Sequence, residues 1–221
     1  RAINCGQHLL NHQVKVAGIP QAWNILQQGQ YTGFFHGAGG IAYALLRLYA
    51  VTADSAYLAA AKAAITYEWS AFLQQPEENI QFSRFDIAGE ILLARLASLS
   101  ILNTTDVYQE LEIVLRTTRR NDLIDVDSIE CGNFGKIEML LLAAQKLDRP
   151  ELREEVLIRA SDIVTGAQLA GGYQFLKLPS SVFNPGLFQG IAGIGYELLR
   201  LVEDLLPSVL SFCISPAQFY R

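Results

Sequence analysis

The chain has 221 residues, of which 51% are hydrophobic, and its formal net charge is −5. This acidic balance argues against a nucleic-acid-binding surface, which requires clustered Lys and Arg. No apolar run reaches the roughly 18 residues of a membrane span, because charged residues such as Arg95 and Arg200 interrupt the candidates. We therefore expect the apolar residues to form a protein core, with no membrane span.

The cysteines indicate the redox compartment of the protein, and the lack of linker segments indicates its number of domains. The three cysteines are widely spaced without a Cys-x-x-Cys motif, and no signal-peptide pattern is present, which favours a reduced, cytoplasmic protein. No segment rich in Pro, Gly or Ser and no block of charge divides the sequence. Residues 1–221 are accordingly predicted to form a single domain.

In chain order, the predicted elements are all helices and alternate between two kinds. Four helices are placed in an outer ring, at 2–14, 54–73, 104–120 and 149–168. Four others are apolar on nearly all sides and are placed in a buried inner ring, near 38–51, 88–101, 134–147 and 191–205. The expected fold class is all-α, a partial α/α toroid or barrel with about four outer–inner helix pairs.

An internal repeat marks the entry to the inner helices. The segment His36–Leu48 returns as Gln189–Leu201 without a gap, and weaker copies begin at Asp86 and Gly132. The copies start about 50 residues apart, which is the length of a helical hairpin with its loops. We expect the glycines of each copy to lie in the turn into an inner helix, where they allow positive φ and close backbone approach. All these turns are expected at one end of the barrel.

Three polar residues near the repeats have structural interpretations. Arg47 and Arg200 are in register and are expected to extend to the outer ring or to a helix C-terminus, where a cation is favourable. Asn133 is interpreted as the cap of the helix that follows it.

Two further groups of polar residues are interpreted as solvated. Asp122, Asp125 and Asp127 form a short acidic loop before the third copy of the repeat. His8 and His12 are four residues apart on the first helix, a spacing that can hold a metal ion on one face. Because they lack a third ligand and lie on an outer helix, a surface role is favoured for them.

Four segments together resemble the lanthionine synthetase C-like cyclases: Gly33–Leu45, Asp127–Gly135, Pro185–Leu201 and Pro207–Leu210. The similarity is closest to the C-terminal cyclase portion of type 2 lanthipeptide synthetases. Family members close a toroid of seven inner and seven outer helices, so this chain resembles the last part of a cyclase. The first and last inner helices are then expected to lack ring neighbours and to expose apolar surface.

The resemblance also implies an activity and partners. Members of the family add a peptide cysteine thiol across a dehydroalanine or dehydrobutyrine, which forms a thioether ring. The reaction needs a thiolate as the nucleophile and a proton for the enolate that results. The expected partners are a peptide substrate, namely a lanthipeptide precursor, or the rest of a larger synthetase.

The resemblance further implies a zinc site, from which this sequence departs. In the family, zinc is held by a Cys of the second copy and by an adjacent Cys-His or Cys-Cys pair before the third copy, and it activates the substrate thiol. The corresponding positions here are Arg84, Glu130 and Cys131. An arginine cannot lose its proton to serve as a ligand, whereas Cys131 and Glu130 remain possible metal ligands. Zinc is therefore expected to be absent or weakly bound, with an ion pair between Arg84 and Glu130 in its place.

His36 is the catalytic candidate that the resemblance supports. It directly precedes the glycine of the first copy, at the position where the family has a histidine that acts as a general acid or base. The alternative is that His36 packs or caps the turn. We expect His36, Arg84, Glu130 and Cys131 to converge at the same end of the helical array.

Two functional classes stay open on the sequence alone. One is a cyclase domain of lanthipeptide biosynthesis that is degenerate at its zinc site. The other is a non-catalytic relative that keeps the toroid and a peptide-binding mouth. An α/α-barrel glycosidase is not supported, because no paired carboxylates lie at the glycine turns.

Overall fold

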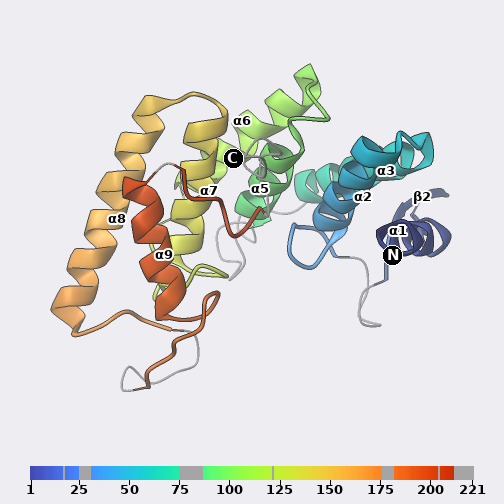
Figure 1. Cartoon of the computed structure of the whole chain (residues 1–221). Coiled ribbons are helices and arrows are strands. Elements are labelled where there is room, and N and C mark those ends of the chain that lie inside the picture. Colours follow the sequence, from blue (N-terminus) through green and yellow to red (C-terminus); the bar gives the residue numbers. More distant parts are fainter. Residues whose placement is uncertain are drawn as a thin grey trace. The chain divides into compact units, whose positions relative to one another are not determined.

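The computed structural model describes residues 1–16, 18–24, 31–74, 87–120, 122–175, 182–203 and 205–211. Within these ranges the chain is mainly helical (Figure 1). The elements in chain order are α1 (Ala2–Asn11), β1 (Val14–Val16), β2 (Ile19–Ala22), α2 (Ala38–Thr52), α3 (Ser55–Leu73), α5 (Ile87–Ser98), α6 (Thr105–Arg120), α7 (Asn133–Lys146), α8 (Pro150–Ala170) and α9 (Ile191–Val202).

The helices confirm the all-α class. The expected inner helices correspond to α2, α5, α7 and α9, and the expected outer helices to α1, α3, α6 and α8. The end of the first helix was predicted wrongly, because α1 stops at Asn11 and Val14 belongs to a short antiparallel hairpin with β2. Valine favours a strand, and Gly18 turns the chain with a φ of +84°. The closed arrangement of a toroid stays a prediction.

Contacts within the chain group it into two compact units. Unit 1 comprises residues 1–83 and 90–114, and unit 2 comprises residues 84–89 and 115–221. The single domain expected over residues 1–221 stays a prediction. Each unit has a core of its own, built from buried residues of its helices.

In unit 1, α2 packs along α3, and α1 contacts both of these helices (Figure 1). Leu45 and Leu46 of α2 and Ala61 and Ala64 of α3 are fully buried in this core. Alanines on α3 leave room for the leucines, so the two helices pack closely. The Asp54 side chain caps α3 by accepting a hydrogen bond from the Ala56 N–H group at 2.9 Å.

In unit 2, α7 contacts α8 and α9, and Figure 1 shows these three helices side by side. Every residue of α7 from Asn133 to Ala144 is buried. For α7, this confirms the expectation that the helix is covered on all sides. The helix α9 was also expected to be buried on all sides, but it leaves Leu199 and Val202 56% and 79% exposed.

Within the described parts of the chain, no helix combines the length and the apolar content needed to cross a bilayer.

Candidate functional site

Three inner helices begin in turns of the same backbone geometry. The residue before α2, α7 and α9 is a glycine with extended backbone, with φ from −143° to −125° and ψ from −169° to −162°. In each turn, the first helical N–H group donates to the carbonyl group seven residues earlier. The donor–acceptor pairs are Ala38–Tyr31, Asn133–Val126 and Ile191–Asn184, at 2.8–2.9 Å. The internal repeat thus encodes a repeated backbone turn.

The second glycine of each turn is required by close backbone approach. A Cβ atom there would overlap a backbone carbonyl oxygen six residues earlier. The glycine–carbonyl pairs are Gly40–Phe34, Gly135–Ile129 and Gly193–Leu187. The expectation of positive φ at the repeat glycines is wrong for these turns, and positive φ occurs instead at Gly33, with +96°.

In unit 2, the turns before α7 and α9 lie against each other. The Glu130 N–H group donates to the Phe188 carbonyl group at 3.0 Å. The Gln189 side-chain amide donates to the Glu130 carboxylate at 2.5 Å. These two turns therefore share one end of unit 2, as expected from the repeat.

Cys131 lies half-buried on the turn before α7, next to Glu130. Burial raises the pKa of the Cys131 thiol, and the charge of Glu130 raises it further, whereas a hydrogen bond with Ser128 opposes the shift. A raised pKa favours the neutral thiol, which is a weak nucleophile and a weak metal ligand.

The described residues do not form a complete zinc site. The described residues contain no group of three or more His, Cys, Asp or Glu side chains placed to hold a metal, whereas zinc sites take three or four protein ligands. The Glu130 carboxylate already accepts a hydrogen bond from Gln189, and Cys131 favours its neutral form. Arg84, with the ion pair expected between it and Glu130, lies outside the described residues.

The turn that carries His36 belongs to unit 1 and is held by two buried carboxylates. The Gly33 N–H group donates to Glu68 at 2.8 Å, and the Phe35 N–H group donates to Glu90 at 3.1 Å. These bonds fix the backbone on the N-terminal side of His36, whose side chain is exposed. The turn thereby holds an accessible imidazole on fixed backbone. Its convergence with Glu130 and Cys131, which belong to unit 2, stays a prediction.

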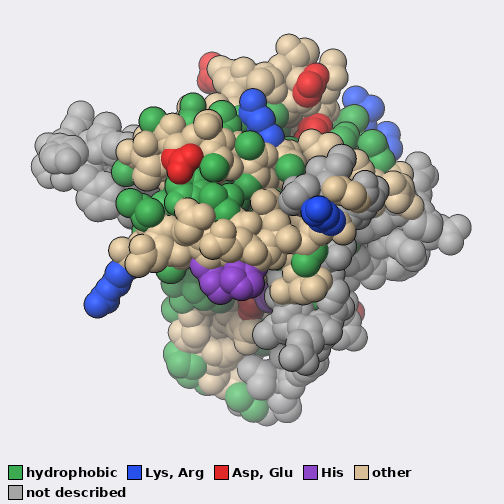
Figure 2. Space-filling model, turned by 90° about the vertical axis from the view of Figure 1, so that its right-hand side faces the viewer, with side chains coloured by type: hydrophobic (Ala, Val, Ile, Leu, Met, Phe, Trp, Pro, Cys, Tyr) green, Lys and Arg blue, Asp and Glu red, His purple; other side chains and the backbone are tan. Residues whose placement is uncertain are grey.

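The histidine pair of α1 is a surface feature, as predicted. His8 and His12 are exposed, and their rings stack with centroids 3.9 Å apart. The His12 Nδ1 atom lies 2.8 Å from the His8 carbonyl oxygen, where it is placed to donate. Figure 2 shows histidine side chains at the surface.

Two sequence interpretations near α7 are corrected. Asp127 is only 7% exposed rather than solvated, and its carboxylate accepts hydrogen bonds from Asn133 and from the Gln174 N–H group, both at 2.9 Å. Asn133 is not the cap of α7, because Gly132 takes that position. The Asn133 side chain instead holds both backbone groups of Ile124. The buried Asn133 side chain, which has both donors and acceptors, thereby holds the loop that precedes α7.

Unit 1 contains a buried ion cluster that the sequence analysis did not anticipate. Arg95 of α5, 1% exposed, contacts Glu68 at 2.6 Å and Glu110 at 2.5 Å. Burial alone would lower the pKa of the Arg95 guanidinium, but the charges of the two carboxylates outweigh this effect and raise it. Burial raises the pKa of Glu110, and Arg95 opposes that shift.

Unit 2 contains a second buried ion cluster. Arg200 of α9 contacts Glu138 of α7 at 2.9 Å and also donates to the Leu206 carbonyl group. Glu197 is fully buried, and its carboxylate lies 3.8 Å from Arg200 Nε. Burial is the main cause that raises the pKa of Glu197 to about 10, with added effects from the charge of Glu138 and a hydrogen bond to it. Glu197 is therefore neutral at pH 7.

A signal for these clusters was present in the sequence. Charged residues such as Glu138, Glu197 and Arg200 interrupt helices that are otherwise apolar on all sides. Because such a helix has no solvent-exposed face, a charged side chain within it requires a buried partner of opposite charge or a hydrogen bond. The register of the repeat was misleading, since Arg47 is exposed whereas Arg200, its counterpart, is 2% exposed.

Comparison with known proteins identifies a family for these repeated turns. The model of the family "Lanthionine synthetase C-like protein" matches residues 1–85 and 88–213. This match covers most of the chain and includes the three described turns. A comparison with curated proteins finds no match.

Proposed function

Because the chain belongs to the lanthionine synthetase C-like family, we propose that it acts on peptide thiols as a cyclase domain of lanthipeptide biosynthesis. The reaction is the addition of a cysteine thiol to a dehydroalanine or dehydrobutyrine of the same peptide. The observation that carries this proposal is the match over most of the chain, combined with the turn that recurs before α2, α7 and α9. The similarity to type 2 synthetases suggests a larger synthetase as the setting.

His36 is the proton-transfer group in this proposal. The substrate thiol gives its proton to the imidazole, and the sulfur forms a bond to the β-carbon of the dehydro residue. The electrons of the double bond move to the enolate, whose α-carbon then takes a proton from the imidazolium. An imidazole suits both steps because it titrates near neutral pH. The exposed position of His36 on a turn held by Glu68 and Glu90 supports the role.

We propose that zinc, if it binds at all, is held weakly by Glu130 and Cys131. The hydrogen bond from Gln189 to Glu130 and the raised pKa of the Cys131 thiol both oppose metal coordination. The prediction is a zinc content far below one ion per chain after dialysis against buffer without metal. Elemental analysis by plasma mass spectrometry measures it, and a stoichiometric zinc content would contradict the proposal.

The activity can be tested with a synthetic peptide that carries one cysteine and one dehydroalanine. Ring closure leaves the mass unchanged, so the remaining free thiol is alkylated and counted by mass spectrometry. We expect faster ring closure with the chain than without it. His36→Gln should slow it by about a hundredfold, which is the usual contribution of a general acid or base.

The matched control removes the two exposed histidines of α1. The double variant His8→Gln with His12→Gln should close the ring at the rate of the unaltered chain. Retention of the peptide without any acceleration would instead identify the chain as a non-catalytic peptide-binding relative.

A further inference from the structure

A cleft lined by arginines lies on unit 2, apart from the glycine turns. Arg116, Arg119 and Arg120 of α6 line it together with Glu155 of α8, and its volume is about 320 Å³. The three arginines lie within little more than one helical turn, so they present their charges on one side of α6. A cationic cleft is a distinctive feature on a chain whose net charge is −5.

The single carboxylate of this cleft does not neutralise it. Glu155 contacts Arg119 at 2.6 Å and Arg159 at 3.0 Å, so both of its oxygens are engaged. Arg159 also donates to the Arg119 carbonyl group at 2.5 Å. Arg116 and Arg120 are exposed and have no carboxylate partner among the described residues. Their two guanidinium groups are available to an anionic ligand.

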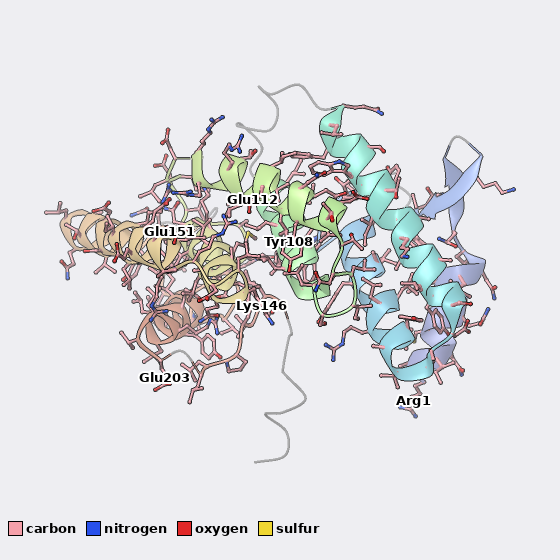
Figure 3. The ribbon with its side chains drawn as sticks, turned by 90° about the horizontal axis from the view of Figure 1, so that it is seen from above. Arg1, Tyr108, Glu112, Lys146, Glu151 and Glu203 are labelled. Carbon is pink, nitrogen blue, oxygen red and sulfur yellow. The ribbon has the colours of Figure 1, made fainter. Side chains whose placement is uncertain are left out.

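The neighbouring surface has the opposite sign. A second hollow of about 570 Å³ adjoins the arginine cleft at Glu155, and its acidic lining residues are Asp122, Glu151, Glu154 and Asp162. Figure 3 labels Glu151 in the first turn of α8. A ligand that is acidic over a long stretch would be repelled there. The occupant of the cleft therefore carries its negative charge in a short segment.

We propose that the cleft of Arg116, Arg119 and Arg120 binds a short acidic segment of the peptide substrate. This inference rests on the proposed function, which makes a peptide the substrate. Guanidinium groups bind carboxylates through two parallel hydrogen bonds, so arginines suit this ligand better than lysines.

The spacing of the arginines matches an extended peptide. Arg116 and Arg120 are one helical turn apart, which separates their side-chain origins by about 6 Å. In an extended peptide, side chains two residues apart lie on the same side and about 7 Å from one another. The matching segment thus has acidic residues at alternate positions, one for Arg116 and one for Arg120. Such a segment serves to position the substrate.

The test measures binding of a fluorescent probe peptide with alternating Glu and Ala, by fluorescence anisotropy with the full chain. The probe contains neither cysteine nor a dehydro residue, so its binding is independent of ring closure. The double variant Arg116→Gln with Arg120→Gln should weaken binding by about tenfold, and added salt should weaken binding to the unaltered chain. A control, Arg47→Gln with Lys62→Gln, removes the same charge from exposed positions of unit 1 and should bind like the unaltered chain.

Four outcomes would overturn the inference. An unchanged affinity of the Arg116/Arg120 variant would exclude the cleft, and an equal loss in the control variant would show a general effect of charge. Equal binding of a probe with Gln in place of Glu would exclude carboxylate recognition. Displacement of the probe by inorganic phosphate at equal concentration would identify a phosphate site instead. If the chain binds the probe but does not close the ring of the cysteine peptide, this inference holds and the proposed activity is wrong. If the chain closes the ring but does not bind the probe, the proposed activity holds and this inference is wrong.

Discussion

Units 1 and 2 each bury an arginine among carboxylates, but the helices that the two arginines join are different. In unit 1, Arg95 of α5 contacts Glu68 of α3 and Glu110 of α6. In unit 2, Arg200 of α9 contacts Glu138 of α7. The first cluster joins three helices through one arginine, and the second joins two.

The two clusters also balance their charges differently. Arg95 has a direct contact of at most 2.6 Å with each of its two carboxylates. In unit 2, no described donor reaches either oxygen of Glu197, so the neutral acid, which brings its own proton, is the favoured form. Unit 1 thus places both of its carboxylates in contact with one cation, whereas in unit 2 the carboxyl group of Glu197 is protonated.

This difference between the clusters shows which structural features the repeat encodes and which are specific to each unit. The turns before α2, α7 and α9 share their backbone geometry in both units. The side chains that hold these turns differ between the units. Glu68 and Glu90 hold the turn in unit 1, whereas Asp127 and Asn133 hold one in unit 2. A repeated backbone can therefore be kept while the polar contacts around it are replaced.

The largest expected effect comes from removing the cation of unit 1. Arg95→Met leaves Glu68 and Glu110 in the interior without their counter-charge, and we expect a loss of about 4 kcal/mol in the free energy of unfolding. Arg200→Met should cost about half as much, because the neutral Glu197 can still donate to Glu138. Urea unfolding at pH 7 measures both variants.

Arg47→Met serves as the matched control for these two variants. Arg47 is in register with Arg200 in the repeat but is exposed, so its replacement should change the free energy of unfolding by less than about 0.5 kcal/mol. Equal losses for Arg95→Met and Arg200→Met would show that the two clusters do not differ in their contribution to stability.

A second expected effect is the pH dependence that Glu197 gives to unit 2. The pKa of Glu197 is raised to about 10 in the folded chain and returns to its ordinary value near 4.5 on unfolding. Between these values the folded state binds more protons, so stability falls as the pH rises, by up to about 1.4 kcal/mol per pH unit. From pH 6 to pH 8 we expect a loss of about 2.7 kcal/mol in the free energy of unfolding.

Glu197→Gln tests this assignment, since the amide resembles the neutral acid but does not titrate. The variant should lose most of the decline between pH 6 and pH 8. The control Glu154→Gln, at an exposed position, should keep the decline of the unaltered chain. The same decline in Glu197→Gln would assign the pH dependence to other groups.

The helices and turns were predictable because both depend on local patterns. The apolar period placed α2, α5, α7 and α9 within a few residues of their observed bounds, and the repeat placed the glycine turns before α2, α7 and α9. His36, Glu130 and Cys131 lie on these turns, as their sequence positions implied. Whether the residues meet depends on how distant turns are arranged, which a local pattern does not contain.

The partners of the residues in the ion clusters, and of the polar residues that hold the turns, were not predictable for a related reason. Arg47 and Arg200 occupy the same position of the repeat, but only Arg200 has a packed neighbour, α7, that carries a carboxylate to meet it. Asp127 reads as a loop residue, yet its carboxylate accepts hydrogen bonds from Asn133 and from the Gln174 N–H group. Burial of a charge is decided by the element packed against it, and that element is far away in the sequence.

The smallest expected effect tests the part that the two units share. Gly193→Ala places a Cβ atom against the Leu187 carbonyl oxygen, and Gly40→Ala does the same against Phe34 in unit 1. Each should cost about 1–2 kcal/mol in the free energy of unfolding, because a backbone group must shift to make room. Gly195→Ala is the control, since a Cβ at this position of α9 meets nothing within 4 Å. It should stabilise the chain by about 0.5–1 kcal/mol through higher helix propensity. Urea unfolding distinguishes the two signs, and a cost at Gly193 without one at Gly40 would show that the turns of the two units are not equivalent.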